Sequence, residues 1–195
     1  YVDEGRAEGE FFHKKSAEYL ERAMYVCPWC GLSVFESHGD TVGCCSCGRK
    51  VRYLPDKSLQ GIGCEFPHPF VAQWYDAQCR FVNGLDVTEL TEKPIYTDTV
   101  QLSEVILYDR KHLLEKEIPV RLYGDRVELG DRMTLAFDDI QVAAVLGENK
   151  LNLYYGDKLY QFKGDKRFNA LKYVNLFYRY KNIKEGKPDG EFLGL

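Results

Sequence analysis

The sequence predicts an α+β chain in which a small cysteine-rich lobe precedes a helix and then an antiparallel β-barrel that a second helix caps. Three observations predict this order. Two Cys-x-x-Cys-Gly motifs, separated by thirteen residues, lie in the first quarter of the chain, and an amphipathic segment follows them. From about residue 95 the hydrophobic period changes from that of a helix to that of a strand.

The composition is that of a folded chain. Of 195 residues, 45% are hydrophobic and 14% aromatic, which suffices for a packed core and excludes general disorder. No apolar run approaches the roughly 18 residues that a membrane-spanning helix needs. The seven cysteines are an odd number and cannot all pair, and the first residues lack an apolar signal core. We therefore expect a reducing, cytoplasmic location, which still allows contact with a membrane surface.

The segment 1–25 is expected to be a helical linker from an upstream domain, because the chain starts without an initiator Met. Apolar residues recur at roughly helical spacing between residues 11 and 25, namely Phe12, Tyr19, Leu20, Ala23 and Met24.

Residues 26–56 contain the two cysteine motifs and predict a zinc ribbon. Each motif, Cys27-Pro-Trp-Cys30-Gly and Cys44-Cys-Ser-Cys47-Gly, places two thiolates near enough to share one metal ion. Four thiolates in a closed tetrahedral site favour Zn²⁺ and leave no open position for a substrate. The site is therefore expected to be structural and to fold a lobe too short for a sufficient core of its own.

Other possible ligands remain open at the level of sequence. Cys45 could replace Cys44, although the repeated Cys-x-x-Cys-Gly pattern favours Cys44. His38 lies between the motifs, where we expect a loop role, and Cys64 and Cys79 have no close partner in the sequence.

Residues 57–94 form a predicted connector with an amphipathic helix over 68–84. Pro69 suits the first helical position, and Asn83-Gly84 supplies a C-terminal stop. Trp74 and Tyr75 belong to the apolar face and are expected to point into a core, with ligand contact by this pair as the alternative.

Residues 95–195 predict a β-domain that ends in a helix. The expected strands are Val100–Tyr108, Pro119–Tyr123, Arg126–Leu129, Met133–Phe137, Ile140–Leu146, Lys150–Tyr155 and Lys158–Lys163. Gly124 and Gly156 suit tight hairpins with positive φ, and Asp165 is expected to cap the final helix. Seven antiparallel strands closed by one C-terminal helix are typical of a pleckstrin-homology-like (PH-like) barrel.

The net charge of −4 conceals an asymmetry. From residue 150 to 184 there are nine basic and two acidic residues, a net +7, which leaves −11 for the rest. This stretch predicts either a solvated face or a surface for an anionic partner such as a lipid headgroup. The candidate residues for such a patch are Lys150, Lys158, Lys163, Lys166 and Arg167.

The two cysteine motifs, the Arg49-Lys50-Val51 that follows them and the later Trp74-Tyr75 pair resemble a known arrangement. They are similar to the C-terminal extension of Firmicutes-type 1-acylglycerol-3-phosphate acyltransferase-like proteins. The resemblance implies that the parent protein acts in membrane phospholipid synthesis. The catalytic motif of that family, a His with an Asp five residues later, does not occur in this sequence.

These residues bear on three possible functions. The leading interpretation is a non-catalytic accessory region that contacts anionic lipid or the parent acyltransferase domain. The alternative is a zinc-ribbon nucleic-acid-binding module, which a net charge of only +1 between Tyr25 and Tyr53 makes a weaker match. An enzyme would need a paired nucleophile and base or an open metal position, and the sequence displays neither.

Overall fold

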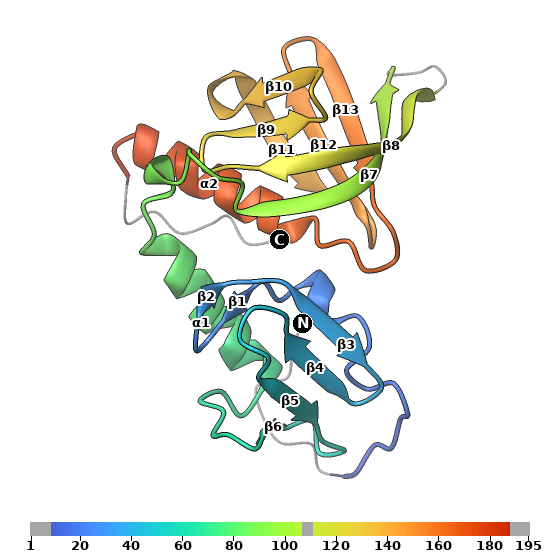
Figure 1. Cartoon of the computed structure of the whole chain (residues 1–195), viewed down its shortest axis with the longest axis vertical. Coiled ribbons are helices and arrows are strands. Elements are labelled where there is room, and N and C mark those ends of the chain that lie inside the picture. The colour runs from blue at the N-terminus through green and yellow to red at the C-terminus, as the bar shows by residue number, and fades with distance from the viewer. Residues whose placement is uncertain (1–8, 107–110, 188–195) are drawn as a thin grey trace. The chain divides into compact units, whose positions relative to one another are not determined.

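The computed structural model describes residues 9–106 and 111–187, and it divides into two units between Phe81 and Val82. Unit 1 contains six short strands and one helix (Figure 1). Its elements are η1 (Leu20–Arg22), β1 (Val26–Cys27), β2 (Gly31–Leu32), β3 (Phe35–His38), β4 (Thr41–Cys44), β5 (Lys50–Tyr53), β6 (Leu59–Ile62) and α1 (Val71–Asn83). Among the described residues no helix is both long enough and apolar enough to cross a membrane.

Unit 1 is built from two antiparallel sheets. Strands β1 and β2 form a two-stranded ribbon that carries the first cysteine motif, and β3-β4-β5-β6 form a four-stranded sheet in sequence order. The sheet buries one face, since Phe35, Val42 and Val51 alternate with exposed or half-buried neighbours. The core of the unit consists of Met24, Cys27, Phe35, Val42, Cys44, Val51, Leu59 and Trp74.

Helix α1 is fixed against β1 by two buried side chains. Trp74 is 1% exposed, and its Nε1–H donates to the carbonyl of Val26 at 3.0 Å. Gln78 accepts at Oε1 from the N–H groups of Tyr25 and Val26, at 2.7 and 3.0 Å. Its Nε2 donates to the carbonyl of Ala23 at 2.9 Å. Because buried backbone groups need partners, Gln78 replaces a neighbouring strand here. The predicted helix and the inward direction of Trp74 are confirmed.

The predicted N-terminal helix is wrong. Between residues 11 and 25 the described chain forms turns and the single 3₁₀ turn η1. Tyr19 has a φ of +72°, which interrupts any helix, and the N–H of Ala17 donates to the carbonyl of Gly39 at 2.9 Å. Phe12, a member of the predicted apolar face, is 79% exposed. Contacts with the neighbouring sheet therefore override the helical period.

The predicted end of the ribbon at residue 56 is also too early. Strand β6 pairs with β5, and α1 packs on the same core, so the lobe continues to Phe81. The stretch that the sequence presents as a connector is therefore divided between the two units.

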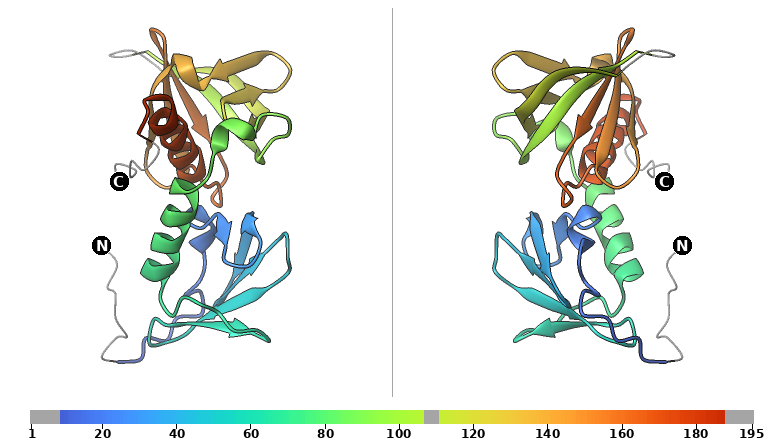
Figure 2. Two further views of the ribbon diagram at one scale, coloured as in Figure 1. Left: turned by 90° about the vertical axis from the view of Figure 1, so that its left-hand side faces the viewer. Right: turned by 90° about the vertical axis from the view of Figure 1, so that its right-hand side faces the viewer.

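Unit 2 is a seven-stranded antiparallel sheet with one helix (Figures 1 and 2). The strand order is β10-β9-β8-β7-β13-β12-β11, and the sheet curls into a half-barrel whose two edge strands, β10 and β11, do not pair with each other within the described residues. The elements are η2 (Val87–Glu89), β7 (Tyr96–Val105), β8 (Lys111–Leu122), β9 (Arg126–Leu129), β10 (Met133–Ala136), η3 (Phe137–Asp139), β11 (Ile140–Val145), β12 (Lys150–Tyr155), β13 (Lys158–Lys163) and α2 (Leu171–Lys184).

The strand predictions hold except around the first hairpin. Strands β9, β12 and β13 have the predicted bounds, and β10 and β11 end one residue early. Strand β7 starts at Tyr96 instead of Val100, and the predicted Leu107 and Tyr108 lie outside the described residues. Strand β8 starts at Lys111, eight residues before the predicted start, because its charged first half pairs with β7 without an alternating apolar pattern.

Helix α2 packs against β11, η2 and η3. Phe137 of η3 lies 5.4 Å from the ring of Phe177 and 5.5 Å from that of Tyr180. The hydroxyl of Tyr180 donates to Asp138 Oδ1 at 2.9 Å. These contacts join α2 to the connection between the two edge strands, where backbone pairing is missing.

The predicted helix cap is wrong by four residues. Asp165 Oδ1 accepts from the N–H of Arg167 at 2.7 Å, which closes a turn ahead of the helix. The first turn of α2 is served by Asn169, whose Oδ1 accepts from the N–H of Lys172 at 3.1 Å.

Two predicted hairpin glycines have different roles. Gly156 has a φ of +59° and makes the tight β12–β13 turn as predicted. Gly124 does not need positive φ. A Cβ at this position would lie 1.7 Å from the carbonyl oxygen of Val87, so glycine is required by the close approach of η2.

A buried ion pair joins the start of the sheet to α2. Lys172 Nζ lies 2.8 Å from Asp98 Oδ2, and the hydroxyl of Tyr173 donates to the same oxygen at 2.6 Å. The side chains of Lys172 and Asp98 are 6% and 20% exposed. Burial lowers the pKa of Lys172, although Asp98 opposes that shift.

Candidate functional site

Four cysteine sulfurs meet at one end of unit 1. Cys27 and Cys30 flank the turn between β1 and β2, and Cys44 and Cys47 flank the turn between β4 and β5. All four Sγ atoms lie within 4.8 Å of one another. Gly31 and Gly48, which follow the second cysteine of each motif, have φ of +81° and +73°, a conformation that favours glycine.

The sulfur separations fit a shared metal ion. The Sγ atoms of Cys27 and Cys47 are 3.7 Å apart, and those of Cys30 and Cys44 are 3.6 Å apart. A tetrahedral ion with metal–sulfur bonds of about 2.3 Å separates its thiolates by about 3.8 Å. A disulfide would need about 2.05 Å, so the four cysteines are arranged as ligands. The cluster can hold a metal ion.

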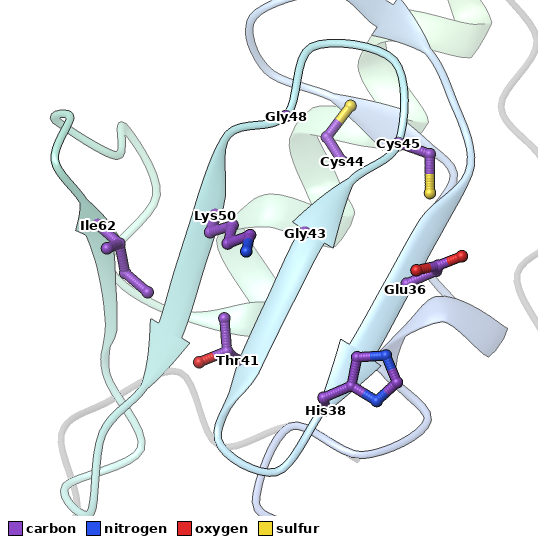
Figure 3. A pocket seen from close by; sticks show the side chains of 9 residues that line it. All are labelled: Glu36, His38, Thr41, Gly43, Cys44, Cys45, Gly48, Lys50 and Ile62. Carbon is purple, nitrogen blue, oxygen red and sulfur yellow. The ribbon is translucent and has the colours of Figure 1, made fainter.

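Cys44, and not Cys45, belongs to this cluster. Cys44 is 3% exposed and forms part of the unit 1 core, whereas Cys45 is exposed. Figure 3 shows that the two sulfur atoms point in opposite directions, with Cys45 directed along the outer face of β3 toward Glu36. Cys44 is the last residue of β4, and Cys45 starts the turn that follows it.

The local environment favours negative charge at Cys44. Burial raises the pKa of Cys27 to about 11 and also raises that of Cys30. At Cys44 burial acts in the same direction, but hydrogen bonds from Ser33 and Cys47 outweigh it and bring the pKa to about 6. A bound divalent cation would displace the remaining thiol protons.

Ser33 contacts one of the four clustered cysteines, and the sequence did not indicate this contact. It is 4% exposed, and its Oγ lies 3.0 Å from Cys44 Sγ and 2.8 Å from Ser46 Oγ. A serine two residues after the first motif has no spacing rule that would mark it, because its contact with Cys44 depends on the fold.

The remaining candidate ligands lie elsewhere. His38 ends β3 on the outer face of the sheet, so the predicted loop role is wrong, and it is not among the clustered ligands. An open groove of about 490 Å³ runs over this face, with Glu36, His38, Thr41, Lys50 and Ile62 among its lining residues (Figure 3). Burial, aided by Glu36, raises the pKa of Cys45 in this groove and keeps its thiol protonated.

The five basic residues singled out in unit 2 do not all lie together. Lys158 follows the β12–β13 turn, and its Nζ lies 3.4 Å from Glu104 Oε1. Lys150 and Lys163 are directly opposite each other at the other end of the same ladder, and Lys166 and Arg167 follow that end in the chain. With about 3.3 Å per residue, Lys158 is separated from Lys163 by roughly 17 Å of strand.

A comparison with protein-family models finds no match for the chain, and a comparison with curated proteins finds none either. Among solved structures, the chain is similar to the N-terminal PH domain of human ARAP2. That similarity has a TM-score of 0.37 and 11% sequence identity, and it covers 50% of this chain and 90% of the PH-domain chain.

Proposed function

We propose that the chain is a non-catalytic accessory region, with a zinc ribbon in unit 1 and a PH-like binding domain in unit 2. The observation that carries this proposal is the cluster of Cys27, Cys30, Cys44 and Cys47. Four sulfur ligands complete a tetrahedral zinc site and leave no coordination position for a substrate or an activated water. The metal would therefore stabilise the lobe and take no part in a reaction.

The PH-like assignment of unit 2 is supported by its strand order and by the helix that follows the last strand. As its partner we propose anionic lipid headgroups, at the cytoplasmic surface of a membrane. The resemblance in the sequence further suggests a phospholipid acyltransferase-like parent protein. For nucleic acid the ribbon is less suited, because Arg52 pairs with Asp40 at 3.3 Å and Arg49 lies over the ring of Trp29.

Elemental analysis of the reduced, freshly purified chain tests the central proposal. We expect one zinc per chain, and Co²⁺ in its place should give the visible and thiolate charge-transfer bands of a tetrahedral sulfur site. A chain that folds with no metal, or that takes up metal without thiolate bands, would contradict the zinc ribbon.

Ser33 is expected to tune the affinity of this site without being a ligand. Replacing it by alanine removes the hydroxyl next to Cys44 Sγ, which lies 3.0 Å away. We expect Ser33→Ala to weaken Zn²⁺ binding about tenfold, as for other contacts behind a ligand. Competition with a zinc chelator measures this. Ser46→Ala is the matched control, because it removes the other serine hydroxyl of the same contact, 2.8 Å from Ser33 Oγ. The Zn²⁺ affinity of this variant should stay near that of the wild type. Unchanged affinity in Ser33→Ala would rule out the role.

A further inference from the structure

Lys150 and Lys163 point to the outer face of the half-barrel. They are opposite each other on β12 and β13, and the next residue on each strand, Leu151 and Phe162, is fully buried against the core. Since side chains alternate along a strand, both lysines must lie on the solvent side of the sheet. The next pair on that side consists of Asn152 and Gln161.

A third lysine, Lys111, is joined by hydrogen bonds to the polar pair Asn152 and Gln161. Lys111 Nζ donates to Gln161 Oε1, and Gln161 Nε2 donates to Asn152 Oδ1 at 2.9 Å. Gln161 is only 6% exposed, so this chain of polar groups is held in place. Lys111 starts β8, 39 residues before Lys150 and 52 before Lys163, so its place in the chain does not group it with them.

The three lysines have no partner of opposite charge among the described residues. No ion pair links Lys111, Lys150 or Lys163 to a described carboxylate, in contrast to Lys158, which pairs with Glu104. Burial together with the charges of Lys150 and Lys163 lowers the pKa of Lys111. Like charges held together in this way favour an anionic ligand.

Exposed apolar side chains lie on the same face, one beside Lys150 and two about 13 Å farther along the strands. Val142 and Tyr154 are opposite each other on β11 and β12, and each is 40% exposed. Leu146, 46% exposed, donates its N–H to the carbonyl of Lys150 at 2.9 Å. An exposed apolar anchor is not evident from the sequence, because the pattern along β11 and β12 does not reveal which side chains stay uncovered.

The combination of basic and exposed apolar side chains distinguishes a lipid bilayer from nucleic acid as the anionic partner. A nucleic-acid surface uses cations and aromatic stacking, and it has no use for exposed aliphatic groups such as Val142 and Leu146. A bilayer interface takes both classes, since basic side chains reach the headgroups while apolar ones enter the acyl boundary.

We propose that the outer face of β8, β11, β12 and β13 docks on an anionic lipid bilayer. Lys111, Lys150 and Lys163 would contact headgroup phosphates, and Val142, Leu146 and Tyr154 would enter the interface. This inference rests on the proposed function and specifies the surface that performs it.

Flotation of the zinc-loaded full chain with vesicles tests the surface. We expect binding to phosphatidylglycerol–phosphatidylcholine vesicles at low salt and little binding to pure phosphatidylcholine. Lys150→Gln with Lys163→Gln should lower the partition coefficient about 25-fold, since each basic residue near an anionic surface contributes about fivefold. Leu146→Ser with Tyr154→Ser should lower it about tenfold and make the remaining binding more sensitive to salt.

The matched control removes the same charge elsewhere. Lys158→Gln with Lys184→Gln neutralises one lysine paired with Glu104 and one at the end of α2, and it should retain most of the binding. Far-UV circular dichroism checks that each variant is folded. If the Lys150 and Lys163 variant binds like this control, the surface is wrong although lipid binding stands. If the wild type binds no anionic vesicle, or binds single-stranded RNA in preference, the lipid partner of the proposed function is overturned as well.

Discussion

Replacing Cys44 by serine is expected to release the metal and unfold unit 1 while unit 2 stays folded. Cys44 is 3% exposed and belongs both to the sulfur cluster and to the core of the unit. A serine hydroxyl is a poor zinc ligand, and three remaining thiols would hold the ion far more weakly. The change therefore removes metal and core packing at the same position.

The size of the effect follows from the size of the lobe. A structural zinc site contributes about 10 kcal/mol or more at neutral pH, which is as much as the whole stability of an ordinary small domain. The core of unit 1 has eight buried members, two of which are the ligands Cys27 and Cys44. Without the ion we expect no cooperative unfolding transition of unit 1 at 25 °C.

The chain offers a selective measurement. Both of its tryptophans, Trp29 and Trp74, lie in unit 1, so tryptophan fluorescence reports on that unit alone. Amide hydrogen exchange of residues 96–106 and 111–184 reports on unit 2 and should remain protected. Adding a strong chelator to the wild type should reproduce the fluorescence change of the variant.

Cys45→Ser is the matched control, because Cys45 is the adjacent residue, is exposed and lies outside the cluster. It should keep one zinc and wild-type fluorescence. If Cys44→Ser keeps the metal and Cys45→Ser loses it, then Cys45 is the ligand and Cys44 is not. Native fluorescence in both variants after chelation would contradict a metal-dependent fold.

The cysteine cluster was predictable because its information is local. Two Cys-x-x-Cys-Gly motifs fix the ligand type, the spacing and the glycine conformation within five residues each. Ser33 and Gln78 were not predictable as contacts, since each acts on a partner that only the fold brings near. Gln78 lies within the correctly predicted helix, but its amide bonds to backbone groups 52 to 55 residues earlier in the chain.

The β-domain was predictable where side chains alternate and turns are tight. Strands β9, β12 and β13 satisfy both conditions and have the predicted bounds. The first half of β8 satisfies neither, because its charged residues pair with β7 without an alternating apolar pattern. The N-terminal segment fails for the opposite reason, since a helical period is present and Tyr19 breaks it by adopting positive φ.

The positions of the basic residues on unit 2 depend on strand register as well as on their number in the sequence. An excess of basic residues was evident over residues 150–184, but their order in the chain does not give their order in space. Antiparallel pairing moves Lys158 to one end of the β12–β13 ladder and joins Lys150 to Lys163 at the other. The β7–β8 hairpin adds Lys111 to this group of basic residues, through its hydrogen bond to Gln161.

Removing the carboxylate of Asp98 is expected to be the most damaging single change in unit 2. Asp98→Ala leaves the ammonium of Lys172, whose side chain is 6% exposed, without its counter-charge. It also removes the acceptor of the Tyr173 hydroxyl, which lies 2.6 Å from Asp98 Oδ2. An uncompensated buried charge typically destabilises a domain by about 3–5 kcal/mol.

Three variants and one control separate the charge from the packing. Chemical unfolding followed by far-UV circular dichroism, with zinc present throughout, should show the loss for Asp98→Ala in the transition of unit 2. Lys172→Met should cost less, because Asp98 then keeps its bond to Tyr173 and is itself 20% exposed. The double variant Asp98→Ala with Lys172→Met should lose less unfolding free energy than the two single variants lose together, because it leaves no unpaired ammonium. Asp131→Ala, which removes a carboxylate that is 95% exposed beside Arg121, should change stability by less than about 1 kcal/mol. A loss of similar size in Asp98→Ala and Asp131→Ala would mean that the buried pair does not hold α2 on the sheet.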